Sequence, residues 1–137
     1  MADRVRKVDY YYTTIANRAG QGARLLDSFR DEDVNFLAIH AFPAGSTAQV
    51  DFFPEDPRAF LRAAKKAGIK VSPRRTAFLV QGKDRVGAMA RILEKLGDAK
   101  INVTATDGIA VGDRFGMLVW VRPDNVNRAA RVLGARR

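Results

Sequence analysis

The sequence contains no cysteine and only one histidine, His40. The absence of cysteine excludes disulfides, thiol nucleophiles, cysteine-ligated metal sites and iron–sulfur clusters. No set of nucleophile, base and orienting group is recognisable in the remaining residues. His40 alternates with apolar neighbours and is interpreted as an ordinary strand residue. We therefore predict that the protein is not an enzyme, with no catalytic residue, no metal and no cofactor.

Long apolar runs are also absent. No stretch approaches the ~18 consecutive apolar residues that a membrane span needs, and the N-terminal Met-Ala-Asp-Arg does not resemble a signal peptide. Hydrophobic residues nevertheless make up 47% of the chain, which is typical of a globular protein. We therefore expect a cytoplasmic protein that does not contact a membrane.

Acidic residues are scarce in the second half of the chain. The net charge is +9, of which residues 1–72 carry +2 and residues 73–137 carry +7. A basic half can indicate nucleic acid or an acidic partner. These charges are scattered instead of clustered, and no strand carries the Lys/Arg-Gly-Phe pattern of RNA-recognition sheets. Nucleic-acid binding is therefore the less favoured hypothesis.

An internal repeat organises the chain. Asn17-Arg18-Ala19-Gly20 recurs 67 residues later as Asp84-Arg85-Val86-Gly87, and Asn35 recurs as Asn102. The register holds without a gap from residue 17 to residue 38, and 8 of these 22 positions are identical. This predicts one supersecondary unit used twice, as a first repeat (1–72) and a second repeat (73–137). Because each repeat is near the lower size limit for an independent core, the two should share buried surface.

Hydrophobic periodicity predicts six elements in the first repeat. Strands are expected at 8–15, 34–42, 47–53 and 69–72, with helices at 20–31 and from Asp56-Pro57 to about 67. The order strand, helix, strand, strand, helix, strand is that of the ferredoxin-like βαββαβ unit. The predicted fold class is therefore α+β, with an antiparallel sheet and both helices of a unit on one face.

The second repeat has the same pattern but lacks the last strand. Its elements are expected at 76–81, 86–98, 101–111, 114–121 and 125–133. The missing strand would leave an open edge at 76–81, which the other repeat, the N-terminal segment 4–8 or another chain could cover. This edge and the small units favour a homodimer or a tight pseudo-dimer. The helices are expected to turn four side chains towards their sheets: Leu26, Phe29, Leu93 and Leu96.

A candidate site recurs in both repeats. After the first strand, a short loop carries Asn17 or Asp84, and a helix begins near Gly20 or Gly87. The free N–H groups of a first helical turn suit a carboxylate, and glycine lets a ligand approach the backbone. Asn35 and Asn102 begin the next strand. Simple helix capping, helix packing and turn formation also explain these residues one by one, but the repetition of the whole set favours a small zwitterion or anion as ligand.

At these residues the chain resembles the ACT domain, a small amino-acid-binding regulatory module. Residues 82–96 and 100–103 resemble its loop, helix and second strand, and residues 16–20 and 33–36 resemble the same motif in serine-sensing ACT domains. The family often has proline where Ala19 and Val86 stand. The resemblance covers residues 8 to 134 and implies ten ligand-binding residues: Asn17, Arg18, Ala19, Gly20, Asn35, Asp84, Arg85, Val86, Gly87 and Asn102.

The resemblance implies a stand-alone, tandem ACT-type sensor. Such a protein would bind a free amino acid at unit interfaces, near the loops between the first strand and first helix, and would report to a separate regulated enzyme or regulator. Asn17 should make the first repeat the better site, since Asp84 would repel a ligand carboxylate in the second. The alternative is a basic nucleic-acid-associated or protein-interaction module of the same fold.

Overall fold

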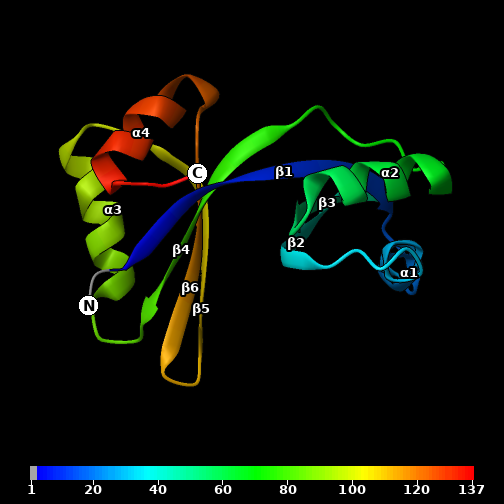
Figure 1. The fold of residues 1–137 in the computed structure, drawn as a ribbon, viewed down its shortest axis with the longest axis horizontal. Coiled ribbons are helices and arrows are strands. Elements are labelled where there is room, and N and C mark those ends of the chain that lie inside the picture. The colour runs from blue at the N-terminus through cyan, green and yellow to red at the C-terminus, as the bar shows by residue number, and fades with distance from the viewer. Residues whose placement is uncertain (1–2) are drawn as a thin grey trace. The chain divides into compact units, whose positions relative to one another are not determined.

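The computed structural model describes residues 3–137 and has the predicted α+β fold (Figure 1). The elements are β1 (Arg4–Ala16), α1 (Gln21–Arg30), β2 (Phe36–Ala44), β3 (Thr47–Pro54), α2 (Pro57–Ala67), β4 (Arg75–Lys83), α3 (Ala88–Asp98), β5 (Val103–Val111), β6 (Arg114–Val121), the 3-10 turn η1 (Pro123–Asn125) and α4 (Val126–Leu133). The strand order is β2-β3-β1-β4-β6-β5. The prediction of two ferredoxin-like units in tandem is confirmed.

The chain divides into two compact units, and strand β1 contributes to both. The first unit is Asp9–Arg75, and the second unit combines residues 3–8 with Thr76–Arg137. The start of β1 therefore belongs with the second half of the chain. Residues 9–16 belong with the first half.

The core of the first unit is an aromatic cluster under its two helices. Phe29 of α1, Phe52 of β3 and Phe60 of α2 have no exposed surface. The rings of Phe29 and Phe60 stack with their centroids 4.9 Å apart, and Tyr11 of β1 stacks on Phe60 at 5.3 Å. Burial of such large aromatic side chains supplies most of what holds helices to a sheet in so small a unit.

The start of α2 follows the capping rule expected from Asp56-Pro57. The Asp56 carboxylate accepts hydrogen bonds from the N–H groups of Arg58 and Ala59, at 3.1 and 3.3 Å. Pro57 occupies the first helical position, where its missing N–H costs nothing. The helix ends at Gly68, whose φ of 72° is a left-handed value.

Segment 69–72 lies beside β1 but is not a regular strand. The N–H of Ser72 donates to the carbonyl of Tyr12 at 2.9 Å, while the N–H of Tyr12 donates to the Ser72 hydroxyl at 3.0 Å. A side-chain oxygen thus replaces a backbone carbonyl. Pro73, which has no N–H, follows directly. The predicted fourth strand is present in position only, and its hydrogen-bond ladder does not form.

The N-terminal segment completes the second unit. Val5 is 6% exposed and belongs to the core beneath α3 and α4. The N–H of Lys7 donates to the carbonyl of Arg136 at 2.7 Å, and the N–H of Arg136 donates to the carbonyl of Val5 at 2.9 Å. In the sheet β1 is the neighbour of β4. Of the three candidates for covering the open edge, the structure selects the segment 4–8.

Two of the four helix residues predicted to face the sheet do not. Phe29 and Leu96 are fully buried, as expected, but Leu26 and Leu93 are 37% and 36% exposed. Their preceding neighbours take the inner positions: Leu25 and Ile92 are 8% and 2% exposed. Residues four apart share a helix face, so 25 and 29 form one row and 92 and 96 the other. Leu26 of α1 and Leu93 of α3 each lie one position further round their helix and therefore point towards solvent.

Candidate functional site

The two predicted loops have the same backbone geometry. The N–H of Asn17 donates to the carbonyl of Ser46 at 3.0 Å, and the N–H of Asp84 donates to the carbonyl of Asp113 at 2.8 Å. Each hydrogen bond joins the loop before a helix to the hairpin turn of the same unit, between β2 and β3 or between β5 and β6. The residues of one bond lie 67 positions before those of the other, so the repeat extends to the hydrogen bonds.

Gly20 and Gly87 are the N-caps of α1 and α3, and both have a φ of 85°. A β-carbon at either glycine would meet no atom within 4 Å. The glycines are therefore required by the left-handed backbone, and helix packing does not explain them. Neither helix has a side-chain cap. The alternative that Asn17 and Asp84 are simple helix caps is thus wrong, because each lies three residues before the N-cap.

Uncapped helix starts leave free donors. Within residues 3–137, the N–H groups of Gly22 and Ala23 in α1 and of Met89 and Ala90 in α3 have no hydrogen-bond acceptor. No acidic residue lies in the first turn of either helix. Free N–H groups and the positive end of the helix dipole favour a bound anion. Each loop therefore presents two unused donors beside an open left-handed glycine.

Asn35 does not lie beside Asn17 in the first unit. Asn17 bonds to Ser46, immediately before β3, whereas the carbonyl of Asn35 accepts from Glu55, immediately after β3. The eight residues of β3 span roughly 25 Å at about 3.3 Å each. Asp84 and Asn102 lie at opposite ends of β6 in the same way. A single unit cannot bring both residues to one small ligand.

Asn35 instead borders a groove of about 460 Å³ on the first unit. The lining combines apolar side chains with an ionic rim: Leu26, Arg30, Asp33, Val34, Asn35, Phe36 and Ile39. The Asn35 amide donates to the Glu55 carboxylate at 3.3 Å. The sequence pattern did not predict this groove, because Leu26 was expected in the core. One feature of the sequence does indicate the groove. Leu25 lies four residues before Phe29 and so shares its buried helix face, which leaves Leu26 for the surface.

All ten predicted ligand residues are exposed. Val86 is fully exposed, which leaves the tip of the second loop open to solvent. The two arginines of the loops differ. Arg85 is held by Asp3, whose hydrogen bonds raise the pKa of the guanidinium, whereas the Arg18 side chain has no hydrogen-bond or ion-pair partner within residues 3–137. The arginine of the second loop is therefore paired with the Asp3 carboxylate, whereas the side chain of the arginine of the first loop is unpaired.

His40 lies opposite a buried carboxylate in the β2–β3 pair. Its Nδ1 is 3.1 Å from Oδ2 of Asp51, whose other oxygen accepts from the Gln49 amide at 2.9 Å. His40 is a strand residue, as predicted. No three histidine or acidic side chains among residues 3–137 gather closely enough to hold a metal ion. No helix in the same range has the length and apolar character to cross a bilayer.

No protein-family model matches the sequence, and no curated protein matches it. Solved structures do match. A protein from Bacteroides thetaiotaomicron superposes with a TM-score of 0.82 at 16% identity, over 95% of this chain and 88% of that chain. The ligand-free regulatory subunit of aspartate kinase from Thermus thermophilus gives 0.64 at 14% identity, over 97% and 93%. Aspartokinase alpha and beta subunits give 0.63 at 15% identity, over 97% and 95%.

The chain has the same tandem fold as these structures. At identities below one fifth the likeness is one of fold, and it extends over nearly the whole chain and nearly the whole of each matched chain. The arrangement of two ferredoxin-like units in tandem is thus common to this chain and to the regulatory subunit of aspartate kinase from Thermus thermophilus. Function must be argued from the loops themselves.

Proposed function

We propose that this chain is an amino-acid-binding regulatory protein of the ACT type, without catalytic activity of its own. The observation that carries the proposal is the duplicated helix start, with a left-handed glycine and two free N–H groups in each unit. The ACT-type fold, which the chain has in common with aspartate kinase regulatory subunits, supports a regulatory role. The ligand carboxylate would accept from the N–H groups of Gly22 and Ala23, with Arg18 adding positive charge.

The amino group of the ligand needs an acceptor, and the side-chain carbonyl oxygen of Asn35 is suited to that task. Asn35 of the same unit is too distant from Asn17, so a second copy of the chain would supply it. Among residues 3–137, β2 is an edge strand whose one sheet neighbour is β3. Antiparallel pairing of β2 with β2 of a second copy would bring Asn35 of one copy to the Asn17 end of the other.

Three exposed apolar side chains of β2 suit such a dimer. Leu37, Ile39 and Phe42 are between 36% and 39% exposed, with Leu37 and Ile39 on one face of the strand and Phe42 on the other. A ligand held between two copies would favour one arrangement of the dimer. A separate enzyme or regulator would then respond to that arrangement, by the linkage that couples two binding equilibria. The proposed partners are thus a free amino acid, a second copy and a regulated protein.

A thermal-shift screen of the twenty amino acids, followed by calorimetric titration, tests the proposal. A ligand at a hundredfold excess over its dissociation constant should stabilise the fold by about 2.7 kcal/mol. Asn17→Ala and Asn35→Ala should each abolish binding. Asn127→Ala is the matched control, because Asn127 is an exposed asparagine on α4 of the second unit. No response to any amino acid would refute the function.

Mixing the two variants tests the shared site. A mixed dimer of Asn17→Ala and Asn35→Ala chains would contain one intact site, with Asn35 from one copy and Asn17 from the other. The mixture should therefore regain part of the binding that each variant lacks alone. If the mixture binds no more than its components, the two residues do not share a ligand.

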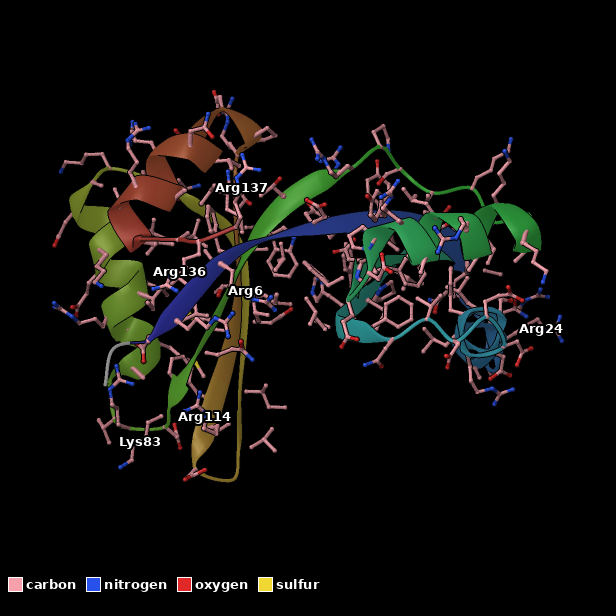
Figure 2. All side chains as sticks on the ribbon, viewed as in Figure 1. Arg6, Arg24, Lys83, Arg114, Arg136 and Arg137 are labelled. Atoms are coloured by element: carbon pink, nitrogen blue, oxygen red, sulfur yellow. The ribbon has the colours of Figure 1, made fainter. Side chains whose placement is uncertain are left out.

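Nucleic-acid binding remains the second candidate function, and one observation favours it. Lys83 and Arg114 lie directly opposite each other in the β4–β6 pair, and neither has an ion-pair partner within residues 3–137 (Figure 2). Two like charges in direct register repel each other unless an anion lies between them. Retention on immobilised DNA or RNA that falls steeply with salt, and that Lys83→Gln weakens, would support this candidate.

A further inference from the structure

Arg85, in the loop between β4 and α3, already binds a carboxylate. Its Nη1 and Nη2 each donate to a separate oxygen of Asp3, both at 3.0 Å, and Nη1 also donates to the carbonyl of Lys83 at 2.8 Å. The Asp3 side chain is only 11% exposed, and the ring of Phe115 lies 5.9 Å from the guanidinium carbon. A bidentate arginine–carboxylate pair is the arrangement by which proteins also recognise carboxylate ligands.

The second unit has a space for this carboxylate that the first unit lacks. A β-carbon at Gly82 would collide with the carboxylate of Asp3 and come within 2.9 Å of the Phe115 ring. The position equivalent to Gly82 in the first unit is Ile15, whose side chain packs against the aromatic core there. The absence of a side chain at Gly82 is therefore what admits Asp3.

Arg18 is the equivalent of Arg85 and provides the internal comparison. It is exposed, and its guanidinium has no hydrogen-bond or ion-pair partner within residues 3–137. The two loops have the same glycine φ and the same closing hydrogen bond. They differ in whether the arginine is already bound to an acid.

We propose that Asp3 is a built-in carboxylate that occupies the arginine of the second loop and closes that loop to free carboxylate ligands. This inference rests on the proposed function for its biological meaning, since the ligand excluded is the amino acid. The first loop is then the only one open, and each chain binds one ligand although it carries two loops. Displacement of Asp3 converts the second loop into a site with an available guanidinium.

Acetate titration followed by NMR tests the occupancy without any amino acid. The Nε–Hε signals of Arg18 and Arg85 are assigned by their loss in the variants Arg18→Lys and Arg85→Lys. In the wild type, sodium acetate should shift only the Arg18 signal beyond the effect of equal sodium chloride. In Asp3→Asn, the Arg85 signal should shift as much as that of Arg18. Asp98→Asn, an exposed acid of the same unit, should behave as the wild type.

Gly82→Ala is the second variant, because it keeps the acid but removes the space for it, and it should also free Arg85. The inference is overturned if the Arg85 signal already responds in the wild type, or if it stays unresponsive in both folded variants. With the amino acid that stabilises the wild type, calorimetry should give one ligand per chain, and two for Asp3→Asn. If acetate shifts the Arg85 signal in the variants but no amino acid binds, the proposed function alone is refuted. If an amino acid binds but acetate does not shift the Arg85 signal in either variant, this inference alone is refuted.

Discussion

Asp33 and Lys100 have the same left-handed backbone, with φ values of 60° and 61°. They are equivalent positions of the repeat, yet one side chain is a carboxylate and the other an ammonium. Each N–H donates to the carbonyl three residues earlier, Arg30 or Gly97, at 3.0 Å. The turn that leaves the first helix of each unit is therefore repeated in the backbone at a position where the side chains have nothing in common.

The left-handed backbone of Lys100 predicts that glycine at this position is stabilising. Lys100→Gly should raise the free energy of unfolding by about 0.5–1 kcal/mol, since relief of left-handed strain exceeds the entropic cost of glycine. Urea denaturation of both proteins measures this difference. Lys70→Gly is the control, because Lys70 is an exposed lysine outside helix and strand without a positive φ, and it should bring no gain.

Neighbouring residues of α3 should respond very differently to truncation. Ile92 is 2% exposed and belongs to the core of the second unit, so Ile92→Ala should cost about 2–5 kcal/mol. Leu93 is 36% exposed, and Leu93→Ala should cost less than half as much. Chemical denaturation of the pair measures both losses. Equal losses would contradict the helix orientation described above.

Two glycines of the same region should have opposite effects when replaced by alanine. Gly87 has a φ of 85°, so Gly87→Ala should destabilise the fold by about 1–2 kcal/mol even though space is available. Gly97 lies within α3, has no positive φ and faces open space, so Gly97→Ala should stabilise by ~0.5–1 kcal/mol. Thermal melts of both variants test the signs, and a stabilised Gly87→Ala protein would contradict the left-handed cap.

Tyr11 predicts a loss of stability in alkali. Burial, followed by the charge of Asp9, raises the pKa of Tyr11 above its usual value of 10.0. Above pH 10 the unfolded chain therefore releases this proton while the folded chain retains it, and the free energy of unfolding falls as the pH rises. In Tyr11→Phe, the free energy of unfolding should fall less steeply between pH 10 and the raised pKa. Denaturation curves at a series of pH values compare the slopes, and identical slopes would exclude the shift.

The fold was largely predictable because its signals are local. Strand alternation and the Asp56-Pro57 helix start lie within short windows, the repeat presents such windows twice, and all agree with the structure. The inner face of each helix was not predictable in the same way. Leu25 and Leu26 are identical in chemistry, and Ile92 and Leu93 nearly so; only the position of the sheet decides which is buried.

The candidate site was predictable in part. The left-handed glycines follow from the sequence, since glycine is the residue that adopts such a backbone without strain. The distance between Asn17 and Asn35 required the strand register, which places them at opposite ends of β3. The role of Asp3 lies outside the repeat, and its partner Arg85 is 82 positions away, so no local pattern indicates it.

The bridge between Arg6 and Arg136 has a consequence for the order of folding. Nearly the whole described sequence lies between these two residues, so the hydrogen bonds that join Val5 and Lys7 to Arg136 are among the contacts of longest range in the molecule, and such contacts form slowly. Asp9–Arg75 is contiguous and is synthesised before its counterpart is complete. During translation the first unit has all its strands and helices available, while residues 3–8 cannot complete their hydrogen bonds until Arg136 has been synthesised. A partly synthesised chain therefore has all the residues of its first unit, while the start of β1 still lacks part of its hydrogen bonding.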